Sequence, residues 1–163
     1  MPMEETLRFT LNDNPIDISP EHKDVPALFF IRDQLGLRET RYGCGSGSCG
    51  ACAILVDDRA MASCDFPVSF LAGKKVETSE IFKTDGGKDV HPVLRAFIQE
   101  QAGQCGYCLS GIAIRIESLR REQPLPDRER VLSELDQHLC RCGAHPRILR
   151  VVKTFFEHLD LNR

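Results

Sequence analysis

Hydrophobic and polar residues alternate through much of the first half of the chain, which is typical of β-strands. In LRFTLN the side chains of Leu7, Phe9 and Leu11 share one face, and this period of two predicts a strand. NDNP follows as a turn, and IDI is suited to the returning strand of a hairpin. Further along, AILV predicts a buried strand, DD a tight turn, AMASC a strand that carries Cys64, and KKVETSE a strand that closes the sheet. The first half therefore predicts a small sheet.

One helical pattern interrupts these strands. Pro26 is suited to the first turn of a helix, because its ring fixes a helical φ and a first-turn N–H has no partner in the helix. Leu28, Ile31 and Leu35 follow at helical spacing, and Gly36 is placed to end the helix. We expect a single helix here, before the first group of cysteines.

The second half changes to a helical period throughout. Apolar residues recur every three or four positions in four stretches, and Asp127 is a candidate N-cap for the third. The stretches are PVLRAFIQEQAG, SGIAIRIESLRREQ, DRERVLSELDQHL and PRILRVVKTFFEHL. Four short amphipathic helices predict a small bundle, and with the preceding sheet they predict the α+β class.

The polar stretch KTDGGKD separates the two patterns and reads as a linker. We therefore expect one domain over residues 1–82, a linker over 83–90 and a helical domain over 91–163. A chain of 163 residues is long enough for two small domains.

Composition narrows the classes of function. The net charge is −3, and acids and bases are mixed along the chain, so nucleic acid and anionic membranes are not expected partners. No apolar run is long enough to cross a bilayer, and we expect no membrane insertion. The first residues carry acids where a signal peptide carries bases, which favours the cytoplasm. Export in a complex with a partner stays compatible with this pattern.

Eight cysteines change the picture most. Eight in 163 residues are about 5%, below the roughly 8–10% that marks a disulfide scaffold, and a reducing compartment keeps thiols reduced. Four structural disulfides are therefore the weaker interpretation. The cysteines form a first quartet and a second quartet, which suggests two metal centres. The first quartet is Cys44, Cys49, Cys52 and Cys64, and the second quartet is Cys105, Cys108, Cys140 and Cys142.

The first quartet has the spacing C-x4-C-x2-C followed by a distant cysteine, which is the plant-type [2Fe–2S] pattern. Its glycines fit that chemistry, because backbone N–H groups can stabilise thiolates only if the loop visits positive φ and approaches closely. The glycines are Gly43, Gly45, Gly47 and Gly50. Structural zinc sites favour paired C-x2-C knuckles, so zinc is the weaker alternative here.

The second quartet, CGYC with CRC, is ambiguous alone, since zinc and a cluster both suit it. Cys105 and Cys108 precede a helix expected to begin near Ser110, where the helix N-terminus favours thiolate. Arg141 lies between the other two cysteines and either offsets cluster charge or is a solvated surface arginine.

Together the quartets carry a family likeness. YGCGSGSCGACAILVDDRAMASC, GQCGYC and HLCRCGAHPRIL resemble the iron–sulfur subunit of molybdenum hydroxylases, the xanthine dehydrogenase and aldehyde oxidoreductase family, over nearly the whole chain. The resemblance implies a ferredoxin-like β-grasp domain with an outer [2Fe–2S] cluster and a four-helix bundle with an inner one. It also implies a large subunit that holds most of a molybdopterin cofactor. By position, Gln104 resembles a glutamine that bonds the pterin, and Cys142 resembles the inner-cluster ligand closest to it.

Two departures point to one branch of the family. Many members have Thr-Pro where this chain has Leu109 and Ser110, and many have a tyrosine where it has GAHPRI. Both variants resemble the two-subunit branch of isoquinoline oxidoreductase and nicotinate dehydrogenase-like enzymes. In that branch the flavin subunit is missing and a cytochrome can accept the electrons.

The resemblance predicts an electron-transfer subunit, with its cysteines as ligands and substrate turnover on the partner. The main alternative is a stand-alone two-cluster ferredoxin, although the helical half then has no evident use. A zinc-stabilised interaction module is the third interpretation. The substrate and final acceptor, whether a flavin subunit or a cytochrome, lie outside what this chain encodes.

Overall fold

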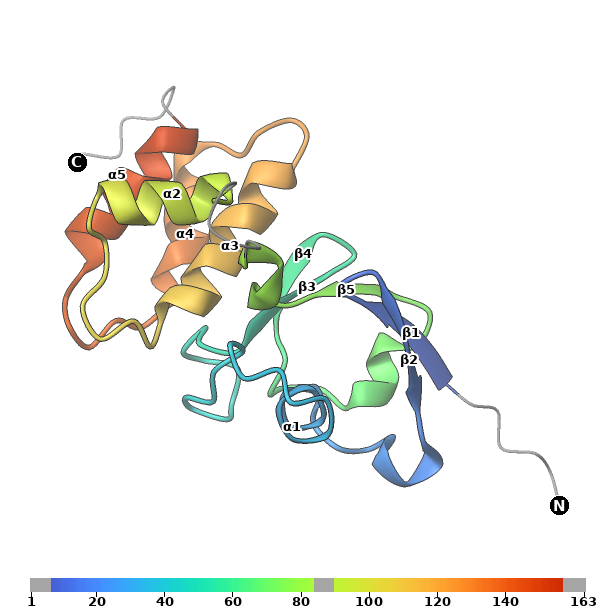
Figure 1. The fold of residues 1–163 in the computed structure, drawn as a ribbon. Coiled ribbons are helices and arrows are strands. Elements are labelled where there is room, and N and C mark those ends of the chain that lie inside the picture. Colours follow the sequence, from blue (N-terminus) through green and yellow to red (C-terminus); the bar gives the residue numbers. More distant parts are fainter. Residues whose placement is uncertain (1–6, 84–89, 157–163) are drawn as a thin grey trace, which may run out of the picture.

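The computed structural model describes residues 7–83 and 90–156, and its first half is built on a five-stranded mixed sheet (Figure 1). The strand order is β2-β1-β5-β3-β4, with β1 and β5 parallel and the other neighbours antiparallel. The strands are β1 (Leu7–Leu11), β2 (Asn14–Ile18), β3 (Ala53–Val56), β4 (Arg59–Ala62) and β5 (Lys75–Glu77). This sheet and the helices that follow confirm the predicted α+β class.

Two tight hairpins follow from the turn residues. Asn12 and Asp13 join β1 to β2 with φ of 47° and 65°, and Asp57 and Asp58 join β3 to β4 with φ of 48° and 67°. Positive φ at both central residues gives a turn whose twist matches that of the strands, and Asn and Asp tolerate it best after glycine. Pro15 lies in β2 at the sheet edge, where its missing N–H costs no ladder bond. The predicted hairpin and DD turn are confirmed.

Three local expectations were wrong. The helix after Pro26 is one α turn, α1 (Ala27–Phe29), that continues as a π turn over Phe30–Gln34. The strand of AMASC ends at Ala62, so Cys64 lies in the turn beyond it. KKVETSE supplies β5, which lies between β1 and β3 rather than at an edge. Periodicity identifies a strand but does not place it in the sheet, because strand order depends on contacts between distant residues.

The four predicted helices of the second half are present. Their bounds are α2 (Pro92–Gln99), α3 (Leu109–Arg121), α4 (Arg128–Asp136) and α5 (His145–Phe155), and short 3-10 turns span Pro20–His22, Val68–Leu71 and Ser79–Phe82. Asp127 is the N-cap of α4, since its carboxylate accepts a bond of 2.9 Å from the Arg130 N–H. Residues 84–89 of the predicted linker and Leu159 of the last predicted helix lie outside the described residues.

Strand β3 belongs to two hydrophobic cores at once. Ile54 and Val56 pack in the core of the sheet half, whereas Ala53 and Leu55 pack in the core of the helical half. Successive side chains of a strand point to opposite faces, so all four residues of AILV are buried. Figure 1 shows the bundle beside β3 and β4, with α3 nearest to the sheet.

Candidate iron–sulfur centres

The first quartet gathers around one glycine-rich loop. Cys44, Cys49 and Cys52 come from the segment between the π turn and β3, and Cys64 comes from the turn after β4. Cys49 and Cys52 are buried, whereas Cys44 is exposed. All eight cysteines of the chain are free thiols, so the structure gives the disulfide interpretation no support.

Backbone N–H groups point at the sulfurs of this loop. Cys44 Sγ accepts from the N–H groups of Ser46 and Ser48, at 3.4 and 3.2 Å. Cys49 Sγ accepts from the Cys44 N–H at 3.3 Å, and Cys64 Sγ accepts from the Gly47 N–H at 3.2 Å. Such donors stabilise thiolate charge, and they are the feature that the glycine pattern predicts.

Two glycines show how closely the backbone approaches. A Cβ on Gly43 would lie 2.5 Å from Cys49 Sγ, which leaves no room for a side chain. Gly50 has a φ of 73°, and its Cβ would lie 2.2 Å from Nδ1 of His138. The loop is therefore a cradle that only glycine permits at these positions.

The thiols of the first quartet lie in two pairs. Cys44 lies beside Cys49, and Cys52 lies beside Cys64. The N–H of Ser46 is the largest cause that lowers the pKa of Cys44 to about 6, whereas burial raises the pKa of Cys52 to about 12. A [2Fe–2S] core has two irons and four thiolate ligands, so two pairs of thiols and inward N–H donors fit this group.

The second quartet is built at helix ends. Cys108 is the N-cap of α3, with Cys105 just before it, and Cys140 and Cys142 lie between α4 and α5. Cys105 lies beside Cys142, and Cys108 lies beside Cys140. The helix begins at Leu109, one residue before the predicted start. The fold thus joins CGYC and CRC into a second set of two pairs.

Backbone donors and burial also act on this quartet. The Tyr107 N–H lowers the pKa of Cys105, whereas burial raises the pKa of Cys108 to about 12. Burial opposes ionisation of Cys140, but the Ala144 N–H, 3.4 Å from its sulfur, contributes to a lowered pKa. A cluster ligand must lose its proton, so binding would release protons chiefly from the buried thiols.

Gln104 and Cys142, the two residues that resemble pterin-side groups, are in contact. The Gln104 side-chain amide donates to the Cys142 carbonyl at 3.3 Å. Gln104 and Cys105 are both exposed. The second quartet thus opens onto the protein surface beside this amide.

Comparison with known proteins agrees with this geometry. Residues 10–80 match the 2Fe-2S iron-sulfur cluster binding domain family, and residues 78–153 match the [2Fe-2S] binding domain family. The small iron–sulfur chain of nicotinate dehydrogenase from Pseudomonas putida is 40% identical over 93% of this chain and 94% of its own length. The alpha chain of isoquinoline 1-oxidoreductase from Brevundimonas diminuta is 37% identical over 87% of this chain and 91% of its own.

The chain belongs to the iron–sulfur subunits of the molybdenum hydroxylase family. It is an electron-transfer subunit with two [2Fe–2S] binding domains, and its relatives carry molybdopterin on a large subunit. These findings do not favour a stand-alone ferredoxin.

Solved structures agree with this assignment. Quinoline 2-oxidoreductase from Pseudomonas putida 86 superposes with a TM-score of 0.77 at 29% identity, over 91% of this chain and 90% of that one. Aldehyde oxidoreductase from Desulfovibrio desulfuricans gives 0.81 at 29% identity, over 93% of this chain but 17% of that chain. The same unit therefore occurs both as a separate chain and as a small part of a longer one. Within residues 7–83 and 90–156, this iron–sulfur subunit has no helix long and apolar enough to cross a membrane.

The two cysteine loops of the iron–sulfur subunit are in direct contact. The Leu139 N–H, next to Cys140, donates to the Cys49 carbonyl at 3.1 Å. The buried ring of His138 fills the space beside Gly50, and its Nε2 accepts from Arg115 at 3.3 Å. Burial, followed by the charge of Arg115, lowers the pKa of His138 to about 4, so the ring is neutral at pH 7.

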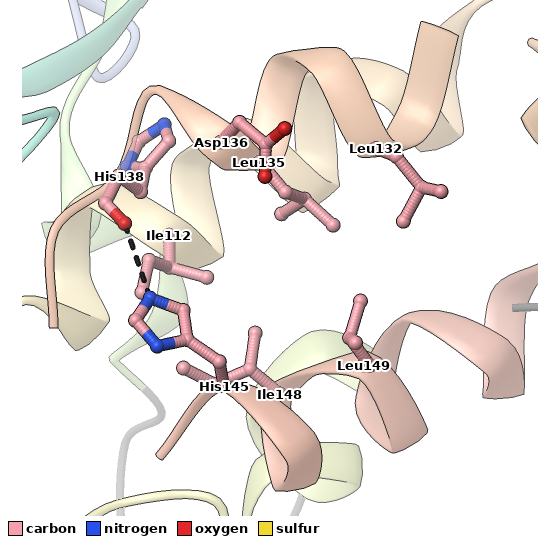
Figure 2. Close-up of a pocket in the computed structure, with 8 residues that line it drawn as sticks. All are labelled: Ile112, Leu132, Leu135, Asp136, His138, His145, Ile148 and Leu149. Atoms are coloured by element: carbon pink, nitrogen blue, oxygen red, sulfur yellow. Dashed lines mark hydrogen bonds between the residues drawn. The ribbon is translucent and has the colours of Figure 1, made fainter. Parts of the chain in front are cut away.

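A cavity of about 310 Å³ lies between α4 and α5, behind the second quartet. Figure 2 shows side chains of the two helices facing each other across it, with the His138 segment at one end. His145 donates from Nε2 to the His138 carbonyl at 3.4 Å, which ties the start of α5 to the segment before Cys140. The cavity therefore lies next to the support of the CRC segment.

Sequence reasoning missed the residues that join the loops. His138 and Leu139 were treated only as the residues before CRC, and Tyr107 only as part of CGYC. A buried histidine opposite a glycine 88 positions away leaves no local pattern.

Proposed function

We propose that the first quartet ligates the outer cluster and the second quartet the inner cluster. On this proposal residues 1–82 carry the outer cluster, residues 83–90 are the linker, and residues 91–163 carry the inner cluster. The pairing of thiols and the N–H donors around their sulfurs support the ligand assignment. Arg141 and the five histidines are outside the ligand set.

We further propose that electrons reach the inner cluster first and leave through the outer one. The observation that carries this order is the contact of Gln104 with Cys142 at an exposed site, because that face suits a cofactor held by another chain. The Leu139–Cys49 bond supports the second transfer, since it joins a residue next to one quartet to a member of the other. Oxidation of a substrate at molybdenum releases two electrons, and each cluster accepts one at a time.

The proposed partner is a large molybdopterin-binding subunit, with Gln104 bonding the pterin and Cys142 the ligand nearest to it. Two relatives are named for nicotinate and isoquinoline, which supports a nitrogen heteroaromatic substrate on that partner. We propose a cytochrome as the acceptor, in keeping with the two-subunit branch, with a flavin-binding subunit being the alternative. Eight free thiols support assembly in the reducing cytoplasm.

Two cysteine variants of the assembled complex test the order. Cys49→Ser should damage the outer cluster, so that substrate still reduces molybdenum and the inner cluster in one turnover while steady-state transfer to the acceptor collapses. Cys108→Ser should block reduction of both clusters. Paramagnetic signals after rapid freezing measure each centre. Full steady-state turnover by the Cys49 variant with its natural acceptor would show that the outer cluster is not on the path.

A further inference from the structure

A tyrosine of one cysteine loop is hydrogen-bonded to the other loop. Tyr107 lies between Cys105 and Cys108 in CGYC, and its phenol donates to the backbone carbonyl of Tyr42, two residues before Cys44. The partners are 65 positions apart in the chain. The bond therefore links the arm of the second quartet that begins α3 to the start of the glycine cradle.

The receiving side of this bond is itself well supported. The ring of Tyr42 packs against Phe29, with 5.7 Å between centroids, and a Cβ on Gly45 would lie 3.0 Å from its hydroxyl. Arg41 holds its guanidinium 5.7 Å from the centroid of the Tyr107 ring. The Tyr42 segment is thereby fixed against the cradle, and the Tyr107 ring against its neighbour.

Core packing does not explain Tyr107. Its side chain is 48% exposed, and Tyr42 is 45% exposed. A ring so open to water gains little from burial, so the hydroxyl contact is what distinguishes Tyr107 from any other exposed aromatic residue. The CRC arm reaches the first loop through the backbone of Leu139, whereas the CGYC arm reaches it through this phenol.

We propose that Tyr107 is a positioning residue for electron transfer between the two clusters, because its bond to Tyr42 fixes the CGYC arm against the outer-cluster loop. The inference rests on the proposed ligand assignment. In the step concerned, one electron leaves the reduced inner cluster and reduces the outer cluster. The Tyr107 phenol keeps its proton and is neither oxidised nor reduced.

Tyr107→Phe in the assembled complex tests the proposal, because it removes one hydroxyl and keeps the ring. Iron and sulfide content and both reduction potentials should match the unmodified complex. The magnetic interaction between the two reduced clusters should change, and single-turnover reduction of the outer cluster should slow by about twofold or more. Amide exchange over residues 43–48 should accelerate roughly two- to twelvefold, the factor that corresponds to the ~0.5–1.5 kcal/mol of one hydrogen bond.

Tyr42→Phe is the matched control, since it also removes one phenolic hydroxyl but keeps the accepting carbonyl. It should retain the magnetic interaction and the transfer rate. Unchanged interaction and unchanged rate in Tyr107→Phe would overturn the proposal, and so would loss of a cluster, because the hydroxyl would then serve cluster binding. Failure of the ligand assignment would appear instead in the unmodified complex, as fewer than two paramagnetic signals, and would overturn both proposals.

Discussion

Glycines and backbone N–H groups, rather than charged side chains, prepare the first cysteine loop for thiolate ligands. Four N–H groups reach sulfurs within 3.4 Å, and Gly43 and Gly50 approach their neighbours too closely for any Cβ. Such fixed dipoles do not titrate, so the stabilisation they give to thiolates holds across the physiological pH range. The cost is that these positions accept no other residue.

Gly50→Ala should therefore destabilise the protein and lower its content of the outer cluster. The new methyl would meet the His138 ring at 2.2 Å, in addition to the strain of an alanine at a φ of 73°. Gly36→Ala is the matched control, because Gly36 has a φ of 70° but open space around it, and it should cost only the ~1–2 kcal/mol of strain. Iron content and urea unfolding of the two variants measure the difference. Equal losses in both would mean that His138 yields and that conformation alone requires Gly50.

At the scale of elements, α3 joins the bundle to the sheet through a buried ion network. Glu117 is 1% exposed and accepts bonds of 2.9 Å from Arg120 and 2.8 Å from Arg121. Arg121 also pairs with Glu77 of β5 and, at 2.6 Å, with Asp58 of the β3–β4 turn. A carboxylate so deeply buried is tolerated because its charge is bonded on both oxygens.

The network predicts a pH-dependent stability. Burial raises the pKa of Glu117, but the bonds from Arg120 and Arg121 outweigh it and hold the pKa below the usual value. The stabilisation is therefore complete above the unfolded pKa of about 4.3 and is lost as pH falls through the lower folded pKa. Glu117→Gln should cost about 3 kcal/mol at pH 7, and the difference should shrink toward about pH 3.

Urea unfolding across this pH range measures the effect. Glu129→Gln removes an exposed carboxylate from the first turn of α4 and should change stability by less than about 0.5 kcal/mol. A Glu117 variant as stable as the unmodified chain at pH 7 would mean that the ion pairs contribute no net free energy.

At the scale of the whole molecule, the two halves share a strand. The opposite faces of β3 contribute to both cores, and the Ser118 hydroxyl of α3 donates to the Asp58 carbonyl at 2.9 Å and accepts from the Ala60 N–H at 3.0 Å. Loss of either core removes one face of β3 from its partner. We therefore expect the halves to unfold together.

Ile54→Ala and Leu55→Ala test this coupling from adjacent positions. Each truncates a fully buried side chain, in the sheet-side and the helix-side core respectively, and should cost ~2–5 kcal/mol. Both should lower the midpoint of one calorimetric transition. Leu125→Ala, at a side chain 42% exposed, is the control and should change the midpoint little. Two transitions, of which each variant shifts only one, would show that the halves unfold independently.

The sequence by itself determined the chemistry and the class of the fold. The spacing of the cysteines and the glycines among them predict cluster loops because ligand geometry and positive φ are local requirements. The helices of the second half and the Asp127 cap follow from period and capping, which are also local. Even the DD turn is encoded by two adjacent residues.

Only the tertiary structure decided what depends on distant residues. It placed β5 inside the sheet, turned the helix after Pro26 into an α turn and a π turn, and buried Glu117 on a helix whose sequence shows it only as a charged position. It also brought the Tyr107 phenol to the Tyr42 carbonyl across 65 residues. Such contacts arise when packed elements meet, and no local period or motif records which residues will then be neighbours.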